Sequence, residues 1–166
     1  MLPLHINVTD KKVLIVGGGK IATRRLQTFL NEGATIRVVS PEASKEIEEL
    51  AETGVIQWEQ KEITIEDLNS ASIIIAATNH PEINEWIAEK ASEHQLVNVV
   101  SSAEKGNLTI PKFVTKGRLT FSVSTNGASP LLAKQICEQI GNQFDEEFIS
   151  ELNRMYEERQ NKKRNF

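Results

Sequence analysis

The chain has 166 residues, 39% of them hydrophobic, which is enough for one domain with a sizeable core and a small appendage. Its 19 basic and 23 acidic side chains give a net charge of −4, which argues against a nucleic-acid partner. No apolar run approaches the roughly 20 residues of a transmembrane helix, and the first residues lack the features of a signal peptide, so we expect a cytoplasmic protein with no membrane partner.

The first part of the chain alternates strand-like and helix-like segments. Residues 13–16 form a short, fully apolar run that ends in three glycines, as expected for a strand buried on both faces. Apolar residues recur at helical spacing over 20–31, and Gly33 follows where a left-handed helix end is favoured. The pattern then predicts, in order, a strand at 35–39, a helix at 44–53, strands at 55–58 and 73–77, a helix at 81–91 and a strand at 97–100.

Strands that alternate with helices at this pace indicate a parallel sheet, because each parallel crossover needs a connection about as long as a helix. Residues 1–111 are therefore predicted to form an α/β domain with a Rossmann-like, doubly wound parallel sheet. Beyond Pro111 the pattern changes to two hairpin-like segments, 112–115 and 119–124, joined by a turn at Lys116-Gly117.

The rest of the chain is predicted to be helical. Ser129 and Pro130 supply an N-cap and a first helical residue for a helix that stops at Gly141, so residues 112–143 form a small hairpin and helix segment. A short C-terminal helical region, residues 144–166, carries Phe144, Phe148, Leu152 and Met155 on one side. Such a stripe needs a partner surface, and a second copy of the chain would provide one.

The segment Gly17-Gly18-Gly19-Lys20-Ile21-Ala22 matches the dinucleotide-binding pattern G-x-G-x-x-A and lies between a predicted strand and a predicted helix. Gly17 permits the tight turn, and Gly19 lets the backbone approach a pyrophosphate. The phosphates would bind beside Lys20 and Ile21, where unpaired N–H groups at a helix N-terminus favour an anion. A plain tight turn is the alternative.

Residues that follow two later strands are candidates for binding the rest of the cofactor. An acidic residue about 20 positions after the glycines usually binds the adenosine ribose, but Ser40 occupies that place. Glu42, after Pro41, could reach the ribose, and an exposed glutamate in a first helical turn is the alternative. Thr78 and Asn79 follow another strand, and ligands of open α/β sheets bind beyond the carboxyl ends of strands.

NAD is the cofactor that these residues predict. Arg37 lies within a predicted strand, so no clear site for the 2′-phosphate of NADP is present. No metal is expected, because His5, His80 and His94 are widely scattered and Cys137 is the only cysteine. His80 is interpreted as an exposed loop residue, with a catalytic role as the alternative.

Several motifs, taken in order, resemble those of precorrin-2 dehydrogenases, a family that also forms the N-terminal part of siroheme synthases. They are Val-Gly-Gly-Gly-Lys-Ile-Ala at 16–22, Ala-Ala-Thr-Asn at 76–79, Asn-Val-Val at 98–100, the hairpin after Pro111, and Ser-Thr-Asn-Gly-Ala-Ser-Pro at 124–130. The resemblance covers roughly residues 3 to 145. It implies oxidation of precorrin-2 to sirohydrochlorin with NAD⁺, Fe²⁺ insertion in bifunctional relatives, and a homodimer joined through the segment after the nucleotide domain.

Precorrin-2 carries several carboxylates, so this resemblance implies a site with positive side chains and N–H donors. Lys112 and Arg118 lie in the predicted hairpin, and Thr125, Asn126 and Gly127 lie just before a helix N-terminus. We interpret these five residues as candidates for binding the substrate. The alternatives are solvated surface charges for the two cations, and an ordinary Asn-Gly turn with a helix cap for the loop.

The chain departs from the family pattern at one chemically important place. The family commonly carries an aspartate directly after Asn-Val-Val, implicated in the chemistry and in chelation, whereas this chain has Ser101 and Ser102. A serine replaces a carboxylate neither as a base near neutral pH nor as an anionic metal ligand. Ser101 and Ser124 are the remaining catalytic candidates, and we do not expect efficient chelation.

The leading prediction is therefore an NAD-dependent precorrin-2 dehydrogenase without strong iron-inserting activity. One alternative is a dinucleotide- or tetrapyrrole-binding module that has lost turnover, motivated by Ser101 and by a shorter C-terminal region than relatives have. A second alternative is an NAD-sensing regulatory domain, against which Ser40 and the loop at 124–130 both argue.

Overall fold

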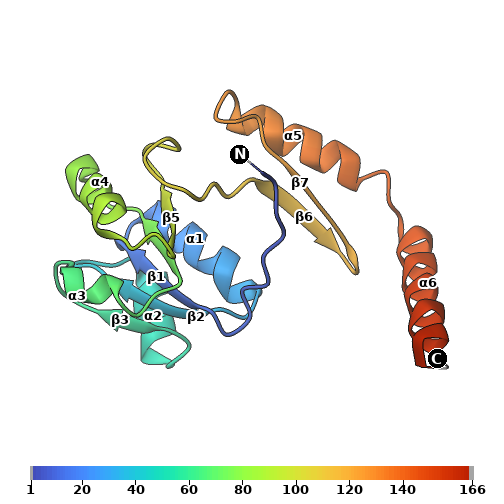
Figure 1. Cartoon of the computed structure of the whole chain (residues 1–166), viewed down its shortest axis with the longest axis horizontal. Helices are drawn as coiled ribbons and strands as arrows, with labels where there is room; N and C mark the ends of the chain where they lie inside the picture. The colour runs from blue at the N-terminus through green and yellow to red at the C-terminus, as the bar shows by residue number, and fades with distance from the viewer. Residues whose placement is uncertain (1, 165–166) are drawn as a thin grey trace. The chain divides into compact units, whose positions relative to one another are not determined.

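The computed structural model describes residues 2–164, and the chain forms two compact units, one up to Thr109 and one from Ile110 onward (Figure 1). The first unit contains a parallel sheet flanked by helices, and the second contains a two-stranded antiparallel sheet with two helices. The predicted fold class, a Rossmann-like sheet followed by a small hairpin and helical segment, is confirmed.

The first unit is built on five parallel strands in the order β3-β2-β1-β4-β5. The strands are β1 (Lys12–Val16), β2 (Thr35–Val39), β3 (Gln57–Glu59), β4 (Ile73–Ala76) and β5 (Leu96–Val99). The central strand, β1, is buried from Val13 to Val16, as its apolar run predicts. The strand order reverses between β1 and β4, and open α/β sheets bind their ligands at such a switch point.

Four helices connect these strands, namely α1 (Lys20–Asn31), α2 (Lys45–Glu52), α3 (Ile65–Leu68) and α4 (Pro81–Lys90). α1 packs against β1 and β2, and buries Ala22, Leu26 and Phe29. α4 packs against β4 and β5, where its Ile87 joins the core cluster that includes Leu14 of β1. Apolar residues on both faces of the sheet thus hold the strand ends in place.

One predicted strand in this unit is shifted, and one short helix was not predicted. The strand expected at 55–58 lies instead at Gln57–Glu59, because the N–H groups of Val55 and Ile56 both donate to Leu50 O and close the end of α2. The polar stretch after it contains the short helix α3, which the sequence analysis did not predict. A reciprocal capping box between Thr64 and Asp67 stabilises its first turn.

The second unit is a hairpin of β6 (Lys112–Lys116) and β7 (Leu119–Val123), followed by α5 (Pro130–Gly141) and α6 (Glu146–Arg164). α5 packs against both strands. Its predicted N-cap is present, since Ser129 Oγ accepts the N–H of Leu132 at 3.1 Å. The turn expected at Lys116-Gly117 is Gly117-Arg118 instead, because Lys116 pairs with Leu119 in the ladder.

The join between α5 and α6 is held by contacts within the second unit. Lys116 Nζ donates to Gly141 O at 2.6 Å and to Phe144 O at 3.0 Å, which pairs the last carbonyl of α5 and one in the connection to α6. The ring of Phe144 lies between those of Phe121 and Phe148, with centroid distances of 6.3 Å and 4.8 Å. No helix within residues 2–164 combines the length and the apolar composition required to span a bilayer.

Candidate functional site

A cleft of about 910 Å³ opens in the first unit, beyond the carboxyl ends of β1, β2 and β4. Seven of the nine predicted cofactor-binding residues line it: Gly17, Gly19, Ser40, Pro41, Glu42, Thr78 and Asn79. The other two, Lys20 and Ile21, form the first turn of α1 and have exposed side chains outside the lining. The cleft therefore lies at the switch point of the sheet, where the glycine pattern predicts a dinucleotide.

The three glycines of the loop have different physical reasons to lack a side chain. A Cβ on Gly17, whose φ is +113°, would lie 2.5 Å from Ala77 O, and a Cβ on Gly18 would lie 2.0 Å from Glu42 O. A Cβ on Gly19 would have no atom within 4 Å apart from those of its chain neighbours. Packing within the protein thus excludes side chains at the first two positions, whereas the third faces open space that a ligand can approach.

The first turn of α1 supplies the electrostatic part of the site. The hydrogen bond from Thr23 N to Gly19 O, at 3.0 Å, is the first bond of the helix, so the three preceding amides have no carbonyl within the helix. Such amides, together with the helix dipole, favour a bound anion. The open face of Gly19 and these amides together fit a pyrophosphate.

Hydrogen bonds of Ser44 and Thr23 connect the segment after β2 to the glycine loop. The N–H of Ser44 donates to Gly18 O at 2.8 Å, and Ser44 Oγ lies 2.8 Å from Thr23 Oγ1. Thr23 Oγ1 also lies 3.1 Å from Gly19 O. The sequence analysis did not identify Gly18, Thr23 or Ser44 as site residues, although Ser44 stands at a recognisable N-cap position of α2.

Ser40 is buried in the cleft wall beside Trp58. Trp58 Nε1 donates to Ser40 Oγ at 3.1 Å and lies 3.2 Å from Ser40 O. The hydroxyl of Ser40 therefore accepts a hydrogen bond from the protein and keeps its own proton for donation. Glu42, two residues later, lines the cleft with its side chain exposed.

The carboxylates that line the cleft are not balanced by lysine or arginine side chains in the described lining. The lining contains Glu42, Glu62 and Glu82, and no lysine or arginine stands among the described lining residues. Arg37 is engaged elsewhere, because its Nη1 lies 2.8 Å from Glu59 Oε1 and 3.0 Å from Asp67 Oδ1. Among the described lining residues, the cleft thus presents carboxylates and no lysine or arginine to a ligand.

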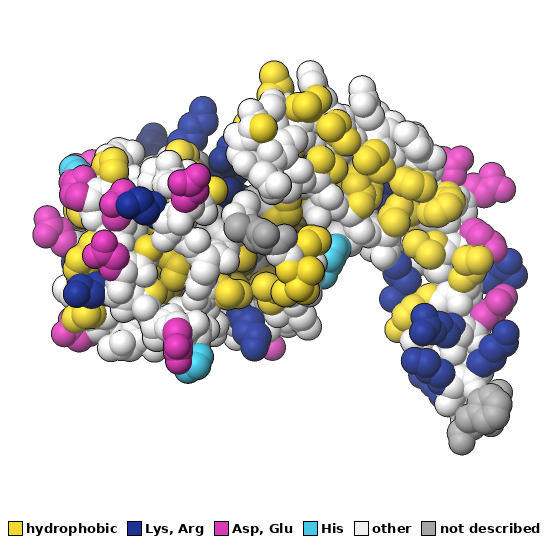
Figure 2. All heavy atoms as spheres, turned by 45° about the horizontal axis from the view of Figure 1, so that its top comes forward, with side chains coloured by type: hydrophobic (Ala, Val, Ile, Leu, Met, Phe, Trp, Pro, Cys, Tyr) yellow, Lys and Arg dark blue, Asp and Glu magenta, His cyan; other side chains and the backbone are white. Residues whose placement is uncertain are grey.

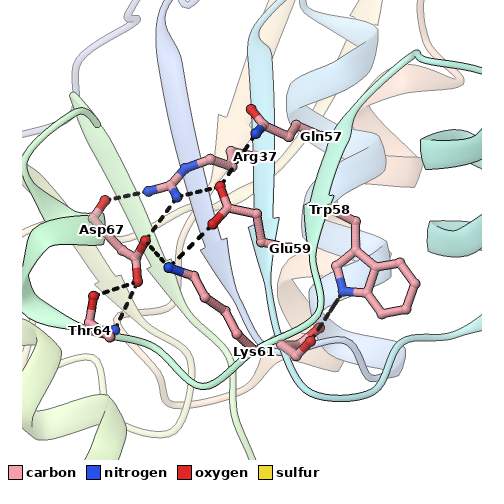
Figure 3. A network of polar contacts seen from close by, with 8 residues as sticks. Arg37, Gln57, Trp58, Glu59, Lys61, Thr64 and Asp67 are labelled. Atoms are coloured by element: carbon pink, nitrogen blue, oxygen red, sulfur yellow. Dashed lines mark hydrogen bonds and ion pairs between the residues drawn. The ribbon is translucent and has the colours of Figure 1, made fainter.

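Asp67 is the centre of the ionic network below this wall (Figure 3). Its side chain is only 6% exposed and accepts hydrogen bonds from Lys61 Nζ at 2.8 Å and from Thr64 N and Oγ1 at 2.9 Å, in addition to Arg37. Burial alone would raise the pKa of this carboxyl, but these hydrogen bonds outweigh it and hold the pKa of Asp67 well below its usual range. The network fixes both neighbours of the lining residues Glu62 and Ile63.

Ser101 lies in the turn that follows β5, at the carboxyl end of the sheet. Its side chain is exposed and is not part of the cleft lining, and the neighbouring N–H of Ser102 donates to Val99 O at 3.2 Å. Parallel strands present their carboxyl ends along one edge, so Ser101 belongs to the same edge as the glycine loop. No carboxylate replaces the family aspartate at this position.

The other candidate loop lies in the second unit and is tightly hydrogen-bonded. Ser124 Oγ accepts the N–H of Asn126 at 3.1 Å, and Thr125 Oγ1 accepts the N–H of Ser129 at 3.0 Å. Asn126 and Gly127 have φ values of +50° and +87°, which shape the turn before α5. Structurally the loop is an Asn-Gly turn with a helix cap, and its role in substrate binding stays a prediction.

The two predicted substrate cations differ in their surroundings. The Arg118 guanidinium carbon lies 3.4 Å from the centroid of the Tyr156 ring, so this side chain makes a cation–π contact with α6. Lys112 is exposed and takes part in no ion pair between described residues. Both lie in the second unit, and their substrate role also stays a prediction.

Comparisons with known proteins assign the chain to a family. Residues 4–112 match a family described as putative NAD(P)-binding. The chain is 49% identical over 162 residues to precorrin-2 dehydrogenase of Bacillus subtilis (strain 168), covering 98% of this chain and 100% of that protein. The chain belongs to the precorrin-2 dehydrogenase family.

A further relative and a solved structure agree with this assignment. A second precorrin-2 dehydrogenase, from Priestia megaterium, is 40% identical over 157 residues, covering 95% of this chain and 78% of that protein. The solved structure described as SirC, precorrin-2 dehydrogenase, is 41% identical, with a TM-score of 0.80 over 95% of this chain and 78% of that one. The predicted family, the oxidoreductase class and the nicotinamide dinucleotide cofactor are thus confirmed.

Proposed function

We propose that this chain oxidises precorrin-2 to sirohydrochlorin with NAD⁺, as its membership of the precorrin-2 dehydrogenase family suggests. The structural observation that most supports this proposal is the open cleft in front of Gly19, beside the unpaired amides of α1. A pyrophosphate can approach the backbone there, because the open side of Gly19 adjoins amides that have no partner within the helix. The reaction transfers one hydride to the cofactor and releases one proton.

The residues of the cleft fit NAD rather than NADP. Glu42, which follows β2, would repel a 2′-phosphate on the adenosine ribose, and Arg37 is already paired with two carboxylates. A glutamate near the end of β2 is instead suited to accept hydrogen bonds from ribose hydroxyls. NAD⁺, when bound, supplies the hydride acceptor, and the protein supplies position and a fixed electrostatic environment.

Positioning, rather than a strong base, is the contribution we assign to the catalytic candidates. The hydroxyls of Ser101 and Ser124 can orient a substrate through hydrogen bonds, but neither ionises near neutral pH. Lys112, Arg118 and the amides of the loop at Thr125 would supply positive charge and N–H donors for substrate carboxylates. Holding the reacting carbon close to the cofactor is itself worth several kcal/mol of activation free energy, on the order of 7 or more in favourable cases.

Turnover is the direct test of this proposal. Purified protein incubated without oxygen with precorrin-2 and NAD⁺ is expected to form NADH, measured at its absorbance band, together with sirohydrochlorin. Replacing NAD⁺ by NADP⁺ is expected to lower kcat/KM roughly a hundredfold or more, because two like charges about 4 Å apart repel by several kcal/mol near a protein surface. Tight binding of NAD⁺ without NADH formation would instead identify a binding module.

Iron insertion is expected to be absent. A chelatase needs an anionic or basic group near the macrocycle, and position 101 holds a serine hydroxyl, which stays protonated near neutral pH. Adding Fe²⁺ or Co²⁺ to sirohydrochlorin with the protein should give the spontaneous rate of metal insertion, followed by the loss of the free tetrapyrrole spectrum. A clear acceleration by the wild-type protein would contradict this expectation.

We also propose that the chain forms a homodimer through the second unit. Apolar side chains stay exposed on α5 and α6, including Leu131 at 66% and Met155 at 57% exposure. Figure 2 shows hydrophobic side chains gathered over this part of the chain. Light scattering should give twice the 18.6 kDa of one chain, and Leu131→Glu together with Leu132→Glu should shift the protein toward the monomer. A monomeric wild-type protein at micromolar concentration would rule the dimer out.

A further inference from the structure

The side chain of Asn84 is completely buried in the first unit, and its hydrogen bonds are all with one residue of the cleft wall, Thr78. Asn84 lies in the first turn of α4, and its exposure is 0%. Asn84 Oδ1 accepts the backbone N–H of Thr78 at 3.1 Å, and Asn84 Nδ2 donates to the backbone carbonyl of Thr78 at 3.0 Å. Asn84 Oδ1 also accepts a hydrogen bond from Thr78 Oγ1, at 2.8 Å.

This arrangement satisfies both backbone groups of Thr78 at once. A carboxamide has one acceptor and one donor side, and here each faces the matching backbone group, as a neighbouring strand would do. β4 ends at Ala76, so Thr78 has no ladder partner of its own. Without Asn84, an N–H and a carbonyl would stay unpaired at the edge of the core, which is costly.

The hydroxyl of Thr78 also fixes the backbone of the residues that follow it. Thr78 Oγ1 accepts the N–H of His80 at 3.1 Å, which closes the turn from Thr78 to His80. Asn79, between them, makes no hydrogen bond with another residue that the structure describes, and it lines the cleft. The polar groups of Asn79 are therefore the ones that this turn presents to a ligand.

The same turn also supports the glycine loop. Ala77, which precedes Thr78, donates its N–H to Val16 O at 2.9 Å. Its carbonyl lies so close to Gly17 that a Cβ there would be 2.5 Å away. A displacement of Thr78 would therefore move the atoms on which Gly17 rests, and with them the pyrophosphate site at Gly19.

We propose that Asn84 is a positioning residue for the cofactor. By holding both backbone groups of Thr78, it directs Asn79 into the cleft and keeps Ala77 as the support of the glycine loop. Asn84 acts through these residues and does not line the cleft itself. This inference rests on the proposed use of NAD and assigns a binding role to a side chain that no motif of the sequence marks.

Gln95 offers a matched control, because it is a second buried amide that hydrogen-bonds the backbone. Its exposure is 8%, its Nε2 donates to Leu68 O at 2.6 Å and Ala71 O at 2.7 Å, and its Oε1 accepts the N–H of Ser92 at 2.8 Å. It is not part of the cleft lining. Replacing either amide by alanine removes about the same kind of bonding, but only one of them supports the cleft.

The test compares Asn84→Ala with Gln95→Ala in the full-length protein. Both variants should unfold at lower temperature than the wild type, but only Asn84→Ala should weaken NAD binding, by roughly tenfold or more in Kd measured by calorimetry. In the turnover assay, Asn84→Ala should raise KM for NAD⁺ by a similar factor. Asn84→Leu has a similar volume and offers neither the acceptor nor the donor that Thr78 needs, so it should also weaken binding if Asn84→Ala does not fold.

Three outcomes would overturn the inference. Wild-type affinity for NAD in both folded Asn84 variants would show that the turn does not depend on this amide. An equal loss of affinity in Gln95→Ala would show that any loss of stability in the unit has the same effect. A wild-type protein that binds no NAD would remove the proposed function along with this inference, whereas the first two outcomes leave the proposed function intact.

Discussion

Replacing Gly19 by aspartate is expected to lower the affinity for NAD roughly a thousandfold, because two like charges about 4 Å apart repel by about 4 kcal/mol near a protein surface. The carboxylate would stand where the pyrophosphate belongs, beside the amides of α1. The free energy of unfolding should stay within about 0.5 kcal/mol of the wild-type value, since a surface substitution without contacts has little effect. Apart from the chain neighbours, no atom lies within 4 Å of a Cβ at this position, and its φ of −84° is open to any residue.

Two neighbouring substitutions separate binding from folding. Gly19→Ala adds only a methyl group on the open face, so it should fold normally and weaken NAD binding less than aspartate does. Gly18→Ala should instead damage the folded state, because its Cβ would lie 2.0 Å from Glu42 O. Calorimetric titration with NAD and thermal unfolding of all three variants provide the measurement. Wild-type affinity in Gly19→Asp would contradict the placement of the pyrophosphate.

The strands and helices with strong periodic signals were predictable from the sequence. The apolar run at 13–16 and the helical spacing over 20–31 correspond to β1 and α1, because burial on one or both faces leaves a regular trace in the sequence. Short elements contain too few residues for a hydrophobic periodicity to be recognised. α3 has only four residues, and the capping pair Thr64 and Asp67 was its sole local signal.

The cofactor cleft was predictable only where a motif marks a backbone requirement. Gly17 and Gly19 occupy the two glycine positions of the dinucleotide-binding pattern. Gly18 stands at a position where the pattern allows any residue, and what excludes a side chain is Glu42 O, a carbonyl brought there by the chain's folding. Asn84 is similar, because it is a polar residue three positions from the buried Ile87 on the same helix face. Its partner at Thr78 is known only from the structure.

The ionic network beneath the cleft wall makes a second strong prediction, which concerns stability. Asp67→Asn keeps the shape of the side chain but removes the charge that faces Arg37 and Lys61. Because breaking a buried ion pair by changing one partner leaves uncompensated charge, the variant should lose about 3 kcal/mol of unfolding free energy at pH 7. Glu59→Gln is the matched control, since Glu59 pairs with the same two cations but is more exposed, and should cost less than about 1 kcal/mol.

The dependence of this loss on pH follows from the depressed pKa of Asp67. Burial opposes ionisation, but hydrogen bonds from Lys61, Thr64 and Arg37 hold the folded pKa well below the unfolded value of about 3.9. The stabilisation is therefore complete above about pH 5 and declines steadily as pH falls toward the folded pKa, because the unfolded chain then binds a proton that the folded chain does not. In urea unfolding, followed by the fluorescence of Trp58 and Trp86 in the first unit, the difference between wild type and Asp67→Asn should shrink progressively below about pH 5. A difference that stayed constant down to pH 3 would show that the charge of Asp67 is not the source of the stability.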